Sequence, residues 1–375
     1  MEKAQMDALL AHGVKNGASD IHFKVGDRPA YRIDGQLRPV NCDPLMPPDT
    51  FAVCSTLLEP NVTPDELKKI QEYDSAYAID GLARFRVNIY RQRGSLCCIL
   101  RAIPGDVPTV EAMGLPATVR TLAEEERGLV LVTGATGSGK STTLAAMVDH
   151  INRTRPVHIL TIEDPIEYLH RHQTASISQR EVGPDTSDFK TALRAALRQD
   201  PDVILVGEMR DIETIDIALK AAETGHMVFS TVHTTDAAKT VNRLIGVFPS
   251  EEQNRARIRL ADALKGIISQ RLLPRANGGG RVAACEILVG NATVRDTIKE
   301  GRDAALRELM EKGRAQYGMQ TFDNHLIDLY KGGEITLEAA KAAATSPGDL
   351  MQELNFGDAA PAFEGAEQEA EPLLE

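Results

Sequence analysis

The sequence predicts an α/β protein of two domains: a small α+β domain followed by a larger domain built on a mostly parallel sheet. Three observations lead to this prediction. The chain has 375 residues, and a single hydrophobic core rarely grows beyond roughly 250 residues. From Gly128 onward, short apolar runs alternate with longer helical patterns, which is typical of a parallel sheet covered on both faces. Between the two halves, Pro104, Gly105 and Pro108 interrupt every periodic pattern.

Residues 1–102 are predicted to form the first domain. Thr63, Pro64 and Glu66 mark the start of one helix, because threonine can cap, proline suits the first turn and glutamate completes a capping box. Gly81 and Gly94 separate strand-like runs. The expected elements, in order, are a helix at residues 4–15, strands at 21–25 and 30–33, two helical stretches, and strands at 76–79, 83–90 and 95–102.

Residues 103–109 are the expected linker, and residues 110–355 are the expected second domain. Ser250 and Gln253 have capping-box spacing, and the chain beyond them has a helical pattern with one strand at residues 282–288. Residues 356–375 are acidic and aperiodic, which is typical of a disordered tail. The other strands expected in this domain lie at residues 129–133, 159–162, 203–206 and 228–232.

The charge of the chain is unevenly spread. Its formal net charge is −12, and the last lysine, Lys341, is followed by eight acidic residues from Asp349 to Glu375. The rest of the chain therefore carries a formal charge of −4. Proteins that bind nucleic acid without specificity need a broad basic surface, so we expect no nucleic-acid partner.

Hydropathy and cysteine spacing argue against several classes of protein. No apolar run approaches the roughly 20 residues that a membrane helix needs, and the first 15 residues lack the apolar core of a secretory signal. We therefore expect a cytoplasmic protein. The five cysteines have no metal-ligand spacing, and His170 and His172 have no matching cluster, so we expect neither a zinc site nor a disulfide framework.

A glycine-rich loop follows the strand predicted at residues 129–133. The run GATGSGKST and the helical pattern after it complete the strand, loop and helix of a Walker A motif. Glycines let backbone N–H groups converge on phosphate oxygens at the positive end of a helix. Lys140 is placed to reach the β- and γ-phosphates of ATP, and Ser141 to hold Mg²⁺. The predicted site for ATP and Mg²⁺ comprises Gly134, Ala135, Thr136, Gly137, Ser138, Gly139, Lys140, Ser141 and Thr142.

Two acidic clusters follow predicted strands at the same edge of the sheet. Glu163, Asp164 and Glu167 follow one strand in TIEDPIEY, and Glu208 follows another in VILVGEMRD. Hydrolysis of a bound triphosphate needs one group that orients water and another that neutralises charge. A carboxylate at a strand end can instead cap a helix. Two such clusters beside a phosphate loop favour a catalytic role for the set.

Two histidines flank the strand predicted at residues 228–232. His226 precedes the strand and His233 follows it. A histidine in such a place can relay the state of the γ-phosphate to a neighbouring helix, or can hydrogen-bond a loop carbonyl. The sequence leaves both roles open.

These motifs resemble those of the secretion-type ATPases and, within them, the type IV pilus retraction (twitching-motility) ATPases. The resemblance covers nearly the whole chain, including SDIHF at Ser19, RFRVN at Arg84, SQREVG at Ser178 and GRVAACEILV at Gly280. It implies that Glu163, Asp164 and Glu167 belong to an Asp box, that His226 and His233 form a His box, and that Glu208 is the Walker B glutamate, which activates water.

The resemblance also implies an architecture and partners. It predicts a PAS-like N-terminal domain and a RecA-like P-loop ATPase core with a helical C-terminal part, assembled as a homohexamer. The expected partners are an inner-membrane platform protein of the type IV pilus machine and a paralogous retraction ATPase, with the chain peripheral to the membrane at the base of that machine.

Arginines of the N-terminal domain close onto the nucleotide in proteins of this kind. Arg84 and Arg86 share one strand face by their spacing of two, and Arg93 follows at the strand end. We expect these three to contribute to the site, with a solvated strand face as the alternative.

The sequence favours an ATP-driven motor for pilus retraction over several alternatives. TVRDTIKE at Thr293 departs from the AIRNLIRE-like helix of retraction motors, and the acidic tail resembles that of the accessory homologue, so an accessory retraction paralogue stays open. A nucleotide-gated docking ring with little turnover is a further alternative. A RecA-like nucleic-acid motor is disfavoured by the acidic balance and by the lack of tryptophan for base stacking.

Overall fold

The computed structural model describes residues 1–33, 35–58, 63–79, 81–103 and 107–356. The chain divides into two compact units, one formed by residues 1–108 with 152–207 and the other by residues 109–151 with 208–375. The predicted linker at residues 103–109 lies partly outside the described residues, and the predicted tail at residues 356–375 lies almost wholly outside them.

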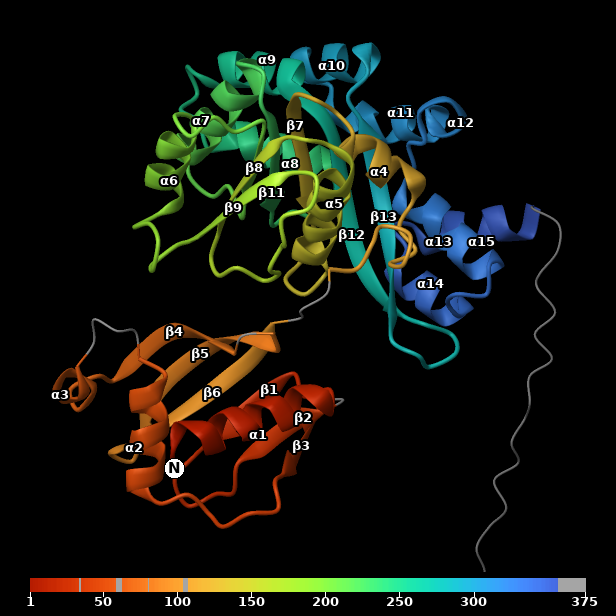
Figure 1. The fold of residues 1–375 in the computed structure, drawn as a ribbon. Helices are drawn as coiled ribbons and strands as arrows, with labels where there is room; N and C mark the ends of the chain where they lie inside the picture. Colours follow the sequence, from red (N-terminus) through yellow and green to blue (C-terminus); the bar gives the residue numbers. More distant parts are fainter. Residues whose placement is uncertain (34, 59–62, 80, 104–106, 357–375) are drawn as a thin grey trace, which may run out of the picture. The chain divides into compact units, whose positions relative to one another are not determined.

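The N-terminal part of the first unit is a six-stranded antiparallel sheet in the order β3-β2-β1-β6-β5-β4, with α1 and α2 on one face (Figure 1). Thr63 caps α3 in a capping box with Glu66, as its sequence predicts. The elements of this part are α1 (Lys3–Lys15), β1 (Asp20–Phe23), β2 (Ala30–Ile33), β3 (Gln36–Pro39), α2 (Pro47–Thr56), α3 (Pro64–Leu67), β4 (Glu72–Ile79), β5 (Ala83–Gln92) and β6 (Ser95–Ile103).

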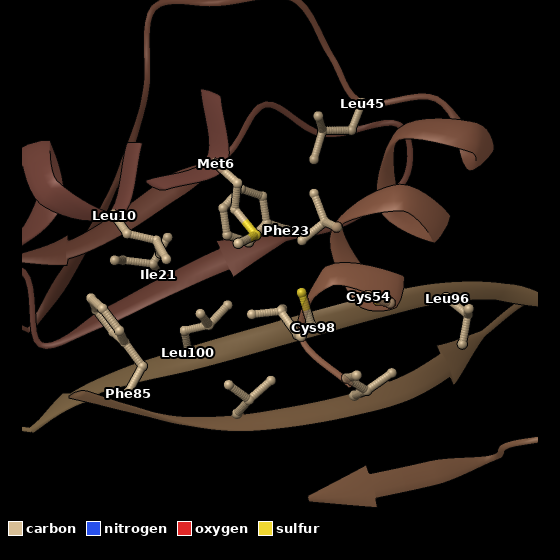
Figure 2. Packing of buried hydrophobic residues seen from close by; sticks show 14 of the residues in the cluster. Met6, Leu10, Ile21, Phe23, Leu45, Cys54, Phe85, Leu96, Cys98 and Leu100 are labelled. Carbon is tan, nitrogen blue, oxygen red and sulfur yellow. The ribbon is translucent and has the colours of Figure 1, made fainter. Parts of the chain in front are cut away.

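The core of this sheet lies between its inner face and the two helices. Met6 and Leu10 of α1 pack against Ile21 and Phe23 of β1, and Leu100 of β6 belongs to the same buried cluster (Figure 2). Side chains alternate along a strand, so the neighbours of Ile21 and Phe23 on β1 point to the opposite face. Each fully buried side chain of this size stabilises the fold by roughly 1.5–3 kcal/mol.

The rest of the first unit contains three parallel strands, in the order β10-β8-β9. Asp188 caps α6, which packs against β8 and β10. All four residues of β10 are buried, which explains its continuous apolar sequence. The elements are β8 (His158–Glu163), β9 (Ser176–Glu181), α6 (Phe189–Ala196) and β10 (Val203–Val206).

The second unit contains strands in the order β13-β12-β7-β11, with β7 parallel to β11 and β12, and β13 antiparallel to β12. In it α7 packs on β7 and β11, and α8 packs on β12 and β13. Its elements begin with α4 (Ala117–Ala123), β7 (Gly128–Thr133), α5 (Lys140–Thr154), α7 (Ile212–Glu223), β11 (Met227–Val232), α8 (Ala237–Gly246), α9 (Gln253–Ala263), β12 (Leu264–Pro274) and β13 (Arg281–Val289). They continue with α10 (Ala292–Lys299), η1 (Asp303–Ala305), α11 (Leu306–Lys312), α12 (Arg314–Tyr317), α13 (Phe322–Lys331), α14 (Leu337–Ala343) and α15 (Pro347–Phe356).

The mixed α/β fold and the predicted strands are confirmed, but three strands were missed and one helix cap was wrong. β3, β9 and β12 were not predicted. The region of β12 was predicted to be helical, because periodicity does not distinguish a short buried strand from a buried helix. The cap predicted at Ser250 is incorrect: α9 begins after Glu252, and the Gln253 side chain donates to the carbonyl of Phe248 at 3.0 Å.

Within the described ranges, no helix is long and apolar enough to cross a membrane. The same residues contain no group of three or more His, Cys, Asp or Glu side chains that could hold a metal ion.

Candidate active site

The glycine loop leaves the end of β7 and enters α5 at Lys140. Gly134, Gly137 and Gly139 have φ values of 147°, 78° and 88°, a backbone region that favours glycine. Gly134 also runs close to other atoms: an added Cβ would lie 2.4 Å from Ser138 Oγ and 2.6 Å from the Gln270 carbonyl oxygen. The first turn of α5 follows directly, so its N–H groups face the loop as in an anion-binding helix terminus.

The polar groups of the loop suit a phosphate ligand. Lys140 is only 8% exposed, and its ammonium donates to the carbonyls of Gly134 at 3.0 Å and Ala135 at 2.9 Å. The hydroxyl of Ser138 is buried and has no hydrogen-bond partner among the described residues. A cation and a buried unsatisfied hydroxyl within one glycine loop fit the oxygens of a nucleotide phosphate. Ser141, in the first turn of α5, is the residue that would hold Mg²⁺.

Glu208 lies at the same sheet edge as the phosphate loop. β11 and β7 are parallel neighbours with Val232 opposite Thr133, so His233 follows one strand where Gly134 follows the other. The Glu208 carboxylate lies 3.5 Å from His233 Nε2 through one oxygen and 2.6 Å from Arg210 Nε through the other. The Glu208 side chain is 19% exposed, so it is accessible but largely enclosed.

Arg210 was not among the predicted site residues. It follows Glu208 by two positions, a local signal that the motif GEMRD contains. Its exposed guanidinium forms the ion pair with Glu208, and an arginine so placed can neutralise negative charge beside the carboxylate.

The two predicted histidines lie at opposite ends of β11. His233 follows the strand and contacts Glu208. His226 precedes it, and its Nδ1 lies 3.0 Å from the carbonyl oxygen of Ala221 near the end of α7. A strand of six residues is about 20 Å long, so these two histidines do not meet within one chain. The sequence left two roles open for His226, and this contact agrees with the role of hydrogen-bonding a carbonyl.

Glu163 ends β8 in the first unit. Its carboxylate accepts hydrogen bonds from Thr161 Oγ1 at 2.7 Å and Gln179 Nε2 at 3.2 Å. Burial raises the pKa of Glu163, while these two donors lower it. Asp164 and Glu167 are exposed, and Glu167 lines a cavity of about 190 Å³.

The predicted arginines divide between the two ends of β5. Arg84 donates to Glu181 Oε2, at the end of β9, over 2.8 Å. Arg86 lines the same cavity as Glu167. Arg93 has φ of 51° in the turn between β5 and β6 and is exposed. At about 3.3 Å per residue, it lies roughly 30 Å along the strand from Arg84, so the three arginines do not gather in one chain.

Glu181 is a second residue that the sequence analysis did not select. Burial raises the pKa of Glu181, and the Arg84 charge beside it lowers it. The motif SQREVG contains this carboxylate, but nothing local indicates a partner 97 residues away.

The family model described as "Type II/IV secretion system protein" matches residues 2–317. The chain belongs to this family. A relative in Pseudomonas aeruginosa, "Type IV pilus retractation ATPase PilT", is 46% identical over 339 residues, covering 90% of this chain and 98% of the relative. A second relative from that organism, "Type IV pilus ATPase PilU", is 40% identical over 353 residues, covering 94% and 92%.

A solved structure agrees with the family membership. The structure described as "Crystal Structure of the Pilus Retraction Motor PilT and Bound ADP" has a TM-score of 0.86 and 45% identity, covering 94% of this chain and 99% of that one. The resemblance to the retraction ATPases is therefore confirmed, and this member of the family is a nucleotide-binding ATP hydrolase. The roles of individual site residues stay predictions.

Proposed function

We propose that this protein is a hexameric ATPase motor that uses ATP and Mg²⁺ to power type IV pilus retraction. It would work in the cytoplasm at the inner-membrane base of the pilus machine, against a platform protein there, and disassembly of the pilus would drive twitching motility. The proposal is supported by the names of its relatives, PilT and a twitching motility protein of Neisseria gonorrhoeae that is 45% identical over 320 residues. Residues 110–355 would form the ATPase domain of each subunit, and residues 1–102 the PAS-like domain.

The observation that carries the catalytic part is the Glu208–His233 contact beside the phosphate loop. The loop amides and Lys140 would bind the phosphates, and Mg²⁺ held by Ser141 would neutralise their charge. Glu208 would then orient a water molecule and accept its proton, with His233 and Arg210 holding the carboxylate. Glu163, at the end of β8, stays a predicted catalytic carboxylate.

The N-terminal arginines would complete the site when the ring closes. Arg84 is bound to Glu181 at 2.8 Å, so it would have to leave that partner to reach a nucleotide. Charge delivered in this way is worth orders of magnitude in the turnover of other P-loop enzymes. A site completed by closure predicts that an isolated subunit hydrolyses ATP poorly.

Steady-state ATP hydrolysis at increasing protein concentration tests this function. We expect specific activity to rise with concentration, and Glu208→Gln to lower kcat by about 100-fold or more while ATP still binds. Glu251→Gln, at an exposed carboxylate outside the loop, is the matched control and should leave kcat unchanged. A native chain that binds ATP but turns it over no faster than Glu208→Gln would point to a docking ring instead.

The alternative, an accessory retraction paralogue, is favoured by the similarity to PilU. Complementation distinguishes the two: a main motor restores twitching to cells lacking their retraction ATPase, whereas an accessory protein restores it only when the main motor is also present.

A further inference from the structure

Glu286 is a buried carboxylate outside the predicted site. It lies on β13 with a fractional exposure of 7%, opposite Ser269 of β12. Ser269 lies in turn opposite Thr133, the last residue of β7, and the two hydroxyls are 2.9 Å apart. Glu286 is therefore two strands away from the start of the phosphate loop, in the same row across the sheet.

The Glu286 side chain binds the first residue of α8. Its Oε1 accepts a hydrogen bond from the backbone N–H of Ala237 at 2.8 Å. That N–H belongs to the first turn, where no carbonyl of the helix can satisfy it. Asp236 already caps α8 by accepting from the N–H of Lys239, so Glu286 holds a different donor and ties the helix to the sheet.

The start of α8 is bound to the loop that carries His233. Thr234 Oγ1 lies 2.7 Å from Thr240 Oγ1, and Thr240 donates to the carbonyl of Asp236 at 2.7 Å. These two hydrogen bonds tie the loop to the first turn of the helix. A shift of that turn would carry His233 out of its 3.5 Å contact with Glu208.

The charges around Glu286 make this link sensitive to pH. The pKa of Glu286 is raised to about 7, mainly by burial and also by the negative charge of Asp236 in the helix cap. The Ala237 N–H, Arg271 of β12 and Arg307 of α11 lower it. A carboxylate binds an N–H more strongly than a neutral acid does, so protonation near neutral pH would weaken the hold on α8.

We propose that Glu286 is a positioning residue of the ATPase site: it fixes the start of α8 and, through that helix, the contact between His233 and Glu208. The inference rests on the proposed function, because it assumes that Glu208 directs the water.

Glu286→Ala and Glu286→Gln, in the full chain, test the role of the carboxylate. We expect Glu286→Ala to lower kcat by about tenfold, since small displacements of catalytic groups are costly. KM for ATP should change by less than roughly twofold, because the phosphate loop is untouched. Glu286→Gln keeps a hydrogen-bond acceptor, so its kcat should stay within about threefold of native. The dependence of kcat on pH that Glu286 causes between about pH 6 and 8 should be absent from this variant.

Ala237→Pro removes the donor instead of the acceptor. Ala237 is the first helical residue, where proline is tolerated, and Asp236 before it has the extended φ of −158° and ψ of 167° that a residue before proline requires. This variant should lose kcat as Glu286→Ala does. The double variant Glu286→Ala/Ala237→Pro should be no slower than the slower single variant, because both remove one link.

Native kcat in a folded Glu286→Ala, or losses that multiply in the double variant, would overturn the proposal. If Glu286→Ala does not fold, Ala237→Pro and Glu286→Gln decide it alone: native kcat in the first, or an unchanged pH profile in the second, counts against it. Glu208→Gln reports separately on the proposed function. If that variant is inactive while Glu286→Ala is unimpaired, the function stands and only this inference fails.

Discussion

Replacing Gly134 by alanine tests how tightly the phosphate loop is packed. The φ of this residue is 147°, and its Cβ would lie 2.4 Å from Ser138 Oγ and 2.6 Å from the Gln270 carbonyl oxygen. The serine side chain can rotate away, but the carbonyl belongs to β12 and moves only with the sheet. Alanine must therefore distort the loop or the strand.

The magnitude follows from two contributions. A backbone conformation almost restricted to glycine costs on the order of 1–3 kcal/mol, and overpacking against fixed atoms adds about 1–3 kcal/mol. Gly134→Ala should therefore lower the free energy of unfolding by roughly 2–6 kcal/mol. Gly137 is the matched control: its φ is 78°, and no heavy atom lies within 4 Å of its added Cβ. Gly137→Ala should cost the backbone strain alone, about 1–2 kcal/mol.

Thermal unfolding followed by circular dichroism measures the difference. In a unit of this size, 1 kcal/mol corresponds to roughly 2–4 °C, so Gly134→Ala should lower Tm by about 4–24 °C and Gly137→Ala by about 2–8 °C. Equal losses in the two variants would refute the argument from close contact. A native Tm in Gly134→Ala would refute the strained loop itself.

Three further predictions concern stability. Because the pKa of Glu286 is raised to about 7, the native state keeps a proton that the unfolded chain releases between about pH 4.5 and 7. The free energy of unfolding should therefore fall as the pH rises through this range. In Glu286→Gln, urea unfolding should show a fall that is smaller by roughly 3 kcal/mol. A parallel pH profile in this variant would contradict it. Burial lowers the pKa of His325 to about 4, so the native state stays neutral where the unfolded chain binds a proton; stability should fall as pH drops from about 6.5 to 4, and a His325→Gln curve with an equal fall would contradict this. Arg259 joins α9 to α7 through hydrogen bonds to Asp216 and Glu223, each at 2.7 Å. Arg259→Ala should lower the free energy of unfolding by roughly 1–2 kcal/mol and leave KM for ATP unchanged. A changed KM would show that Arg259 has a role in the ATPase site.

The strands that the sequence predicted are those whose burial determines their composition. β10 is buried at all four residues and is a continuous apolar run. The missed strands lack such a signal for different reasons. All four residues of β3 are exposed, and β9 has a mixed pattern of buried and exposed positions. β12 is apolar, but its long run beside a helical region has the composition of a buried helix.

Some features of the candidate site depend on neighbouring residues in the sequence, and others depend on residues that are far apart in it. The phosphate loop could be predicted because its function depends on consecutive residues. The contact of Glu208 with His233 joins residues that follow two different strands, β10 and β11, and Arg84 meets Glu181 only through tertiary structure. Spacing in the sequence carries no information on such pairs.

β12, one of the three strands that the sequence analysis missed, lies directly behind the phosphate loop. The carbonyl of Gln270 limits the space behind Gly134, and its side-chain Nε2 donates to Thr143 of α5 at 2.9 Å. The neighbouring Ser269 binds Thr133 on the opposite face. Both ends of the phosphate loop are therefore attached to one strand, so a change in β12 should alter ATP binding without touching any residue of the Walker A motif.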